Sequence, residues 1–161
     1  MSAKKSLSSS RVTEIRNKKA SHKYFLEDKV EAGVVLTGTE VKSIRAGKAQ
    51  INEAFVRFDK NYPILYNAHI EEYAFGNLNN HEPRRPRRLL LHKKEIRKLQ
   101  AALEAKGYSI VPVRMYFKGS LVKVEIALGK GKKLHDKRDD LKKRTALREA
   151  EQSFKQKYHI R

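Results

Sequence analysis

Histidines, carboxylates and serines are the side chains that could do catalytic chemistry here, and their spacing favours none of it. The six histidines are dispersed, without the HExxH or HxxxH spacing that puts two metal ligands on one helix face. Glu71 and Glu72 are more typical of a solvated strand end than of an acid–base pair. We therefore expect a protein that is not an enzyme and holds no metal or other cofactor. A metal-dependent nuclease is the enzymatic alternative.

Basic side chains offer a different chemistry, the binding of anions. The chain has 37 Lys and Arg against 18 Asp and Glu, a formal net charge of +19, and repels itself unless it meets an anion. Membrane binding would require an apolar span of about 20 residues or a Trp-rich amphipathic helix. The sequence has no such span and no Trp. The expected partner is therefore nucleic acid rather than a membrane.

Two kinds of side chain could make the nucleic-acid contacts. The segment RRPRR at 84–88 predicts a phosphate clamp, with a solvated loop as the alternative. Aromatic side chains stack on unpaired bases, although in a small body most of them belong to the core. The candidates for stacking are Tyr24, Phe25, Phe55, Tyr73, Phe75 and Tyr116.

Cysteine and the N-terminus bear on the compartment. The absence of cysteine excludes disulfides, Cys-ligated zinc, iron–sulfur clusters and thiol catalysis. The N-terminal segment MSAKKSLSSSRVTEIRNKK has no hydrophobic stretch of the kind found in secretory signals. We expect a cytoplasmic protein.

One compact body must position the basic and aromatic side chains. Hydrophobic residues are 39% of the 161 and charged residues 34%. We expect a body at 21–130, a basic and largely disordered arm at 1–20, and a C-terminal tail at 131–161. Short strand patterns predict a mainly β fold with α, an OB-type antiparallel barrel of about six strands with two or three flanking helices. A single sheet layered with helices is the alternative.

Local signals place the first elements of the body. YFLEDKVEAGVVLTG at 24–38 is typical of a strand, with a bulge or sharp bend at Gly33. A short helix is expected at 39–47, with Thr39 as its N-cap and a glycine at its end.

Two hairpins and one longer helix complete the body. Alternating apolar residues predict hairpins at 51–70 and 108–128, and Pro112 indicates an edge or a bulge. The segment 76–88 is typical of a loop. Apolar residues spaced three and four apart predict a helix within 89–107.

The tail differs in character from the body. Residues 129–161 are strongly basic, and the glycines of GKGKK at 129–133 could bring backbone N–H groups close to phosphate. Leu147, Ala150, Phe154 and Tyr158 would line one side of a helix, a stripe too narrow to hold a helix alone in water. We expect a tail that is disordered when free and helical when bound.

Five blocks of sequence, in this order, resemble the SmpB family, the SsrA-binding proteins of bacterial trans-translation. The resemblance covers the chain from residue 17 to about residue 144. The blocks are NKKASHKYF at 17–25, EAGVVLTGTEVKSIRAGKAQI at 31–51, RRLLLHKKEI at 87–96, GYSIVPVRMYFK at 107–118 and GKGKKLHDKRDDLKKR at 129–144.

The resemblance implies a fold and a function. It implies an OB-type barrel that binds the tRNA-like domain of tmRNA (SsrA RNA), with no DNA partner expected. The protein would deliver that RNA to stalled 70S ribosomes for rescue and tagging of the nascent peptide. Alanyl-tRNA synthetase and elongation factor Tu would act on the same RNA. The tail would become helical in the empty mRNA channel of the small subunit.

The resemblance also implies roles for particular residues. Glu31 and the segment 90–92 match the contact with the tRNA-like domain, although His92 is Asn in some relatives. His22 matches the approach to the decoding centre, and 136–138 matches a motif needed for tagging. The predicted RNA-binding residues are Lys18, Lys19, His22, Lys23, Glu31, Arg87, Arg88, Leu90, Leu91, His92, Lys93, Lys132 and Lys133. The implied ribosome and tail residues are Asp136, Lys137, Arg138, Lys142, Lys143, Arg144 and Phe154. A structural protein held permanently on ribosomal RNA is the alternative function, since it explains the charge equally well.

Overall fold

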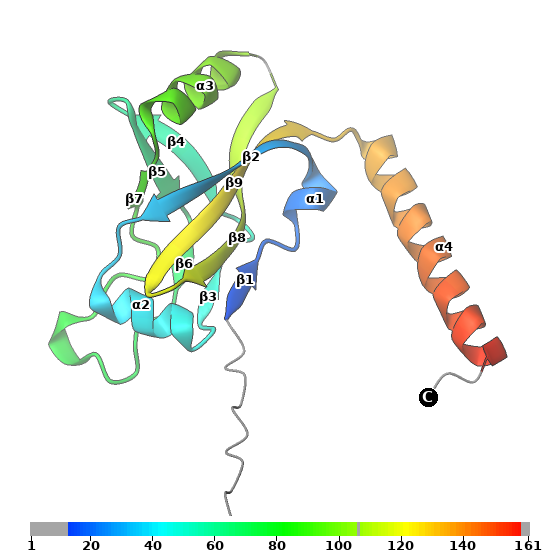
Figure 1. Cartoon of the computed structure of the whole chain (residues 1–161), viewed down its shortest axis with the longest axis horizontal. Helices are drawn as coiled ribbons and strands as arrows, with labels where there is room; N and C mark the ends of the chain where they lie inside the picture. Colours follow the sequence, from blue (N-terminus) through cyan, green and yellow to red (C-terminus); the bar gives the residue numbers. More distant parts are fainter. Residues whose placement is uncertain (1–12, 106, 159–161) are drawn as a thin grey trace, which may run out of the picture.

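The structure, a computed structural model, describes residues 13–105 and 107–158 (Figure 1). Its strands are β1 (Glu14–Arg16), β2 (Tyr24–Val34), β3 (Ala49–Gln50), β4 (Phe55–Asp59), β5 (Tyr62–Tyr66), β6 (His69–Ile70), β7 (Arg87–Leu90), β8 (Tyr108–Lys118) and β9 (Leu121–Gly131). Its helices are α1 (Ala20–Lys23), α2 (Gly38–Arg45), the 3-10 turn η1 (Asn77–Asn79), α3 (Lys93–Glu104) and α4 (Leu134–Tyr158).

The main sheet closes on itself. Its strand order is β1-β8-β4-β5-β7-β2-β9, all neighbours are antiparallel, and β8 also pairs with β9. Six strands therefore form a closed ring, with β1 added outside β8, which removes the exposed edges of an open sheet. The predicted antiparallel fold is confirmed, and a single layered sheet is not what forms.

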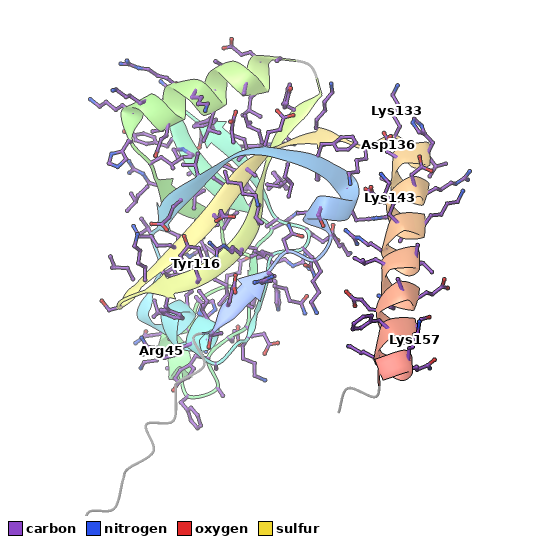
Figure 2. The ribbon with its side chains drawn as sticks, turned by 45° about the vertical axis from the view of Figure 1, so that its right-hand side comes forward. Arg45, Tyr116, Lys133, Asp136, Lys143 and Lys157 are labelled. Carbon is purple, nitrogen blue, oxygen red and sulfur yellow. The ribbon has the colours of Figure 1, made fainter. Side chains whose placement is uncertain are left out.

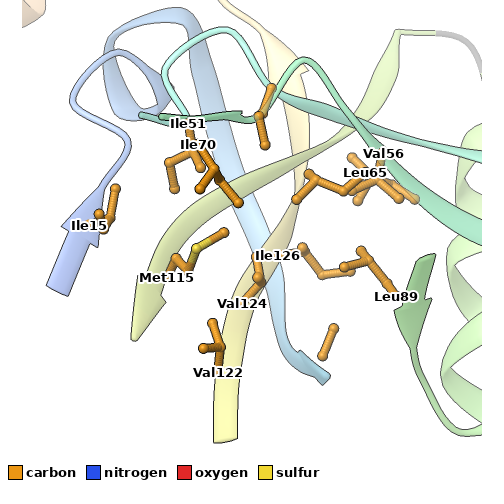
Figure 3. Close-up of a cluster of buried hydrophobic side chains, with 14 of the residues drawn as sticks. Ile15, Ile51, Val56, Leu65, Ile70, Leu89, Met115, Val122, Val124 and Ile126 are labelled. Atoms are coloured by element: carbon orange, nitrogen blue, oxygen red, sulfur yellow. The ribbon is translucent and has the colours of Figure 1, made fainter. Parts of the chain in front are cut away.

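The core fills the interior of this ring (Figure 3). Val122, Val124, Ile126 and Leu128 alternate along β9 and are buried, while Lys123 and Glu125 between them are half-buried on the outer side. This is the period of two expected for a strand with one face on a core. The helix α3 adds Leu99, which is fully buried, to the same cluster.

Both hairpins form where the sequence places them. Asp59 pairs with Tyr62, so Lys60 and Asn61 make a two-residue turn with φ of 48° and 70°. Two left-handed residues are what a tight turn between right-twisted strands requires. In the second hairpin Lys118 pairs with Leu121 across Gly119, whose φ is 63°. Both predicted hairpins are confirmed.

Strand irregularities lie partly elsewhere than expected. The shift of register in β2 falls between Glu27 and Val30, where Asp28 has a φ of 50°. Gly33 is paired on both sides and is not a bulge. A Cβ there would lie 3.2 Å from the Cβ of Leu90, so the glycine permits a close approach of β7 instead. The irregularity expected at Pro112 is confirmed by a register shift between Pro112 and Arg114.

Two helix starts differ from the prediction. The helix α2 begins after Thr37 rather than Thr39, and the Thr37 backbone N–H donates to Glu40 Oε2 at 3.0 Å. The run of three leucines is not helical, because Leu89 and Leu90 belong to β7 and the helix α3 begins at Lys93. A short apolar run fits both periods, and the pairing of β7 with β5 and β2 decided for the strand.

The two ends of the chain also differ from expectation. Within the arm predicted at 1–20, residues 14–16 form β1 on β8, and residues 1–12 lie outside the described residues. At the other end β9 extends to Gly131, and a single 25-residue helix, α4, follows. Figure 1 shows α4 standing apart from the barrel and joined to it at its first turn. Disorder of the free tail stays a prediction.

Candidate nucleic-acid interface

One groove gathers residues that are far apart in the sequence. It has a volume of about 590 Å³ and lies where β2, β7, β9 and the start of α3 meet; we call it the β2–β7 groove. The pairing of Gly33 with both Leu90 and Lys123 brings these strands together. The lining residues are Lys29, Val30, Glu31, Gly33, Leu90, Leu91, His92, Glu95 and Lys123. Glu31 and the segment 90–92, implied at one contact site by sequence resemblance, therefore lie together.

Glu31 is held ionised at the edge of this groove. The Tyr116 hydroxyl donates a hydrogen bond to Glu31 Oε2, and Lys118 Nζ lies 3.1 Å from Oε1. The hydrogen bond from Tyr116, then that from Lys118, lowers the pKa of Glu31 below its ordinary value. A carboxylate oxygen accepts more than one hydrogen bond. Glu31 can therefore accept from a further donor while keeping these two.

Tyr116 is set firmly in place beside Glu31. Burial, and then the hydrogen bond to Glu31, raises the pKa of Tyr116 to about 12, so its hydroxyl keeps the proton that it donates. The guanidinium of Arg114 lies 4.5 Å from the centre of the Tyr116 ring. Arg114 in turn lies 3.0 Å from Glu125 and 3.3 Å from Glu14. The strand register across β1, β8 and β9 thus orients the hydroxyl toward the groove.

His92 and Leu90 present different chemistry on the other wall. His92 is the N-cap of α3, and its backbone N–H donates to Glu95 Oε2 at 3.0 Å. Its side chain is exposed, as is that of Leu90, whereas Leu91 is half-buried against the core. The groove thus combines hydrogen-bond acceptors, cations and exposed apolar surface, as recognition of an irregular RNA surface requires.

A second groove, which the sequence did not indicate, adjoins the first and shares Leu90 and Leu91 with it. It has a volume of about 700 Å³ between β5, β7 and α3, and we call it the β5–α3 groove. The Arg88 guanidinium stacks 4.0 Å from the centre of the Tyr62 ring. The charged residues that line the groove are all basic, and they are Lys60, Arg88, Lys93 and Arg97. Such a surface attracts phosphate. Tyr62 was not among the aromatic residues predicted to stack on bases, because nothing in the sequence distinguishes a single tyrosine that follows a turn.

The arginine cluster of the sequence splits into two roles. Arg87 is fully buried, with Nε 3.0 Å from Glu40 Oε1 and Nη1 2.7 Å from the Ala68 carbonyl. Arg85 donates to both oxygens of Glu40 at 3.0 Å. Arg84 and Arg88 are exposed. The structure contradicts the predicted RNA contact of Arg87, since its donors are used inside the protein.

Glu40 is the centre of this buried cluster. Burial raises the pKa of Glu40, but hydrogen bonds from Arg85 and the Thr37 backbone and the charges of Arg87 and Arg85 outweigh it. The pKa of Glu40 is therefore lowered and the carboxylate stays ionised. A buried charge is tolerated only with such pairing. The cluster ties the loop before β7 to the helix α2.

The predicted basic residues at the start of the body lie around α1. Lys18 is exposed, and His22 is half-buried. Lys19 and Lys23 lie 2.5 Å and 3.5 Å from Glu53, so this carboxylate partly neutralises them. This surface is separate from the two grooves.

Lys132 is the second predicted RNA contact that the structure contradicts. Its side chain is only 8% exposed, its Nζ donates to the Ser21 carbonyl at 2.7 Å, and it forms a salt bridge with Asp140. Arg144 adds a bond to Ser21 Oγ at 3.2 Å. These bonds hold the first turns of α4 against α1. Lys133 beside it is exposed.

The remaining predicted tail residues lie along α4, and they are Asp136, Lys137, Arg138, Lys142, Lys143, Arg144 and Phe154. Figure 2 shows Asp136, Lys143 and Lys157 at successive levels of this helix, and Lys133 just before its start. Asp136, the third residue of the helix, accepts through Oδ2 from the backbone N–H of Lys133 at 3.2 Å, which is the bond that a capping box makes back to the residue before the helix. Leu141, Leu147 and Phe154 are exposed. The helix therefore offers both charge and apolar surface to a partner.

The described residues contain neither a cluster of metal ligands nor a helix that could span a membrane. No group of three or more His, Asp or Glu side chains there could hold a metal ion. The described helices are all too short or too polar to cross a bilayer.

Comparison with known proteins gives consistent matches. A model of the SmpB protein family matches residues 14–156. SsrA-binding proteins of Pelobacter propionicus and Geobacter sulfurreducens are 57% and 55% identical to this chain over 141 residues, covering 88% of it and 93% and 92% of those proteins. A solved structure described as "tmRNA-SmpB: a journey to the center of the bacterial ribosome" is 42% identical, with a TM-score of 0.65 over 76% of this chain and 86% of that chain.

Proposed function

The chain belongs to the SmpB protein family, and from this premise we propose that it binds SsrA RNA (tmRNA) and acts with it on the ribosome in trans-translation. The observation that carries the proposal is the β2–β7 groove, in which Glu31 and the segment 90–92 meet although some 60 residues separate them. A permanent ribosomal-RNA anchor would not need an ionised carboxylate on its RNA-binding face.

The two grooves make the RNA contacts in this proposal. Glu31 accepts hydrogen bonds from base N–H or ribose 2′-OH groups, and Leu90 packs on a base or sugar. Arg88, Lys93 and their basic neighbours in the β5–α3 groove neutralise phosphates. The binding residues within the predicted set are thus Glu31, Arg88, Leu90, Leu91, His92 and Lys93. We expect RNA and not duplex DNA as the ligand.

The other basic surfaces contact the ribosome in this proposal. Lys18, His22 and the α1 surface approach the decoding centre. The helix α4 enters the mRNA channel of the small subunit, where the phosphates of ribosomal RNA neutralise its lysines. Asp136, Lys137 and Arg138 lie in its first two turns, close to the barrel. The body at 21–130 therefore selects the RNA, and the tail at 131–161 senses the vacant channel.

The proposal carries three further expectations. The chain acts by binding and not by catalysis. Alanyl-tRNA synthetase and elongation factor Tu act on the same RNA as functional associates. Action on bacterial ribosomes is expected to occur in the cytoplasm.

The test separates binding from tagging in the full-length chain. One variant carries Asp136→Ala, Lys137→Ala and Arg138→Ala, and the other carries Glu31→Gln. We expect the first to bind the tRNA-like domain of tmRNA like the wild type but to lose peptide tagging on stalled ribosomes, and the second to bind that RNA more weakly. Equal binding of the wild type to an unrelated structured RNA would overturn the proposal.

A further inference from the structure

The loop after β6 has the opposite charge to the rest of the protein. Residues 71–82, EEYAFGNLNNHE, contain three glutamates and no Lys or Arg in a chain of net charge +19; we call this segment the acidic loop. Glu71, Glu72 and Glu82 are all exposed. Figure 1 shows the loop, in green, beside α2 and at the end of the barrel opposite α3. It is therefore separate from the two grooves and from α4.

The acidic loop also displays apolar side chains. Phe75 is 80% exposed and Leu78 101% exposed, which makes them the two most exposed large hydrophobic side chains among the described residues. Both lie within four positions of each other on a loop, rather than at the rim of the core. Exposed apolar groups flanked by polar ones are typical of a docking surface.

Hydrogen bonds hold the acidic loop in one shape. The Asn80 side chain accepts from the Tyr73 N–H at 3.1 Å and donates to the Tyr73 carbonyl at 2.8 Å. A Cβ on Gly76 would lie 2.7 Å from the Asn80 Nδ2, so a larger residue there would displace the Asn80 amide. The His81 ring bonds to Thr39 Oγ1 at 2.8 Å and to the Ile70 carbonyl at 2.9 Å. The apolar tips are thus presented by a preorganised scaffold, which lowers the entropy cost of docking.

The charges of the acidic loop disfavour RNA as its partner. Across the described residues, Glu72 and Glu82 form no salt bridge, and Glu71 has only Lys48 at 3.9 Å. The nearby Lys42 lies over the Tyr73 ring at 5.3 Å. Exposed carboxylates repel a phosphate backbone and attract a basic surface. The sequence-based expectation that Phe75 stacks on RNA therefore does not fit its surroundings.

We propose that the acidic loop docks Phe75 and Leu78 into an apolar pocket on a basic protein, with Glu71, Glu72 and Glu82 facing its cations. Under the proposed function, on which this inference rests, the partner is a basic protein of the ribosome. The contact is made with protein, whereas the grooves and α4 contact RNA. It would fix the orientation of the barrel on the ribosome without adding to the affinity for tmRNA.

A photocrosslink at the loop tests the class of partner. Benzoylphenylalanine replaces Phe75 in the full-length chain, and the matched control replaces Leu121, which is 62% exposed on the β8–β9 turn. Each protein is bound with tmRNA to stalled ribosomes and irradiated. We expect an RNase-resistant adduct between position 75 and a basic ribosomal protein, and none at position 121. Adducts to RNA at position 75, or no adduct there, would overturn the inference.

A second measurement does not depend on the photoreactive group. We expect Phe75→Ser with Leu78→Ser, and separately Glu72→Lys, to weaken ribosome binding about tenfold. Both variants should bind the isolated tRNA-like domain of tmRNA like the wild type, and Leu121→Ser should change neither affinity. Unchanged ribosome binding in both loop variants would contradict the docking surface. Failure of the wild type to bind tmRNA would instead overturn the proposed function.

Discussion

Two glutamates of this protein, Glu40 and Glu31, both have a lowered pKa and both contact cations, yet their surroundings are opposite. Glu40 is fully buried and accepts hydrogen bonds from Arg85, Arg87 and the Thr37 backbone. Glu31 is exposed and accepts from Tyr116 and Lys118. The first glutamate holds the loop before β7 in place, and the second faces a groove.

The difference teaches that burial decides the role of a charge. Around Glu40 the protein supplies every partner, because an unpaired charge inside it would cost several kcal/mol. Around Glu31 water takes the place of some partners, and a ligand can replace that water at little cost. Glu31, which is exposed and lines a groove, is therefore available to accept hydrogen bonds from a ligand.

The largest effect is expected from the buried cluster. Arg87→Met leaves Glu40 short of one partner and leaves the Ala68 carbonyl without its donor, so the free energy of unfolding should fall by about 3–5 kcal/mol. Urea denaturation measures this. The matched control is Arg88→Met on the neighbouring exposed residue, which should change stability by about 0.5 kcal/mol or less. If the two variants lost the same free energy of unfolding, burial would not explain the importance of Arg87.

The second-largest effect is expected from Glu40, through the loss of stability in acid. Because the pKa of Glu40 is lower in the folded state than in the unfolded state, its contribution is fully present above the ordinary carboxyl pKa and is lost as the pH falls through the lowered value. Glu40→Gln should therefore cost about 3 kcal/mol at neutral pH and flatten the decline of stability in acid. Denaturation curves at several pH values measure this, and Glu31→Gln, whose carboxylate also has a lowered pKa but is exposed, should show a smaller effect of the same sign.

Glu31, the exposed glutamate, should matter more for RNA binding than for folding. Glu31→Gln removes the charge that strengthens hydrogen bonds from RNA donors, so affinity for the tRNA-like domain of tmRNA should fall about tenfold. Fluorescence anisotropy with labelled RNA measures this affinity. Glu27→Gln on the same strand, outside the groove, should bind like the wild type. If Glu27→Gln lowered the affinity for RNA by the same factor, the loss in Glu31→Gln would be a general effect of charge and not an effect of the groove.

The smallest change in free energy is expected from a substitution of Lys132, which is less buried than Arg87 and less exposed than Arg88. Lys132→Met removes the bonds to Ser21 and Asp140 and should widen the range of α4 orientations. Since the chain has no cysteine, spin labels can be placed at Ser120→Cys on the barrel and Gln152→Cys on α4. The distance distribution should be broader for Lys132→Met than for the wild type, and unchanged for Lys133→Met. A distribution that Lys132→Met leaves unchanged would show that these bonds do not orient the helix.

Local signals predicted much of the fold correctly. The turns at Lys60 and Gly119 and the alternation along β9 depend only on neighbouring residues. The resemblance of whole blocks also implied that Glu31 and His92 serve one site, and the groove contains both. The helix predicted over the leucines at 89–91 is wrong, because a run of three apolar residues fits the pattern of a strand as well as that of a helix.

The sequence by itself determined the class of partner, the strands joined by tight turns and the places where helices end. Charge, alternation and glycine decide these features because they act over a few neighbouring residues. Only the tertiary structure decided that Arg87 is fully buried and Lys132 half-buried, while Arg88 and Lys133 are exposed. The closure of the ring through β8 and β9 also brought Tyr116 to Glu31. Burial and cross-strand register depend on residues far away in the chain, and a pattern of neighbours does not contain them.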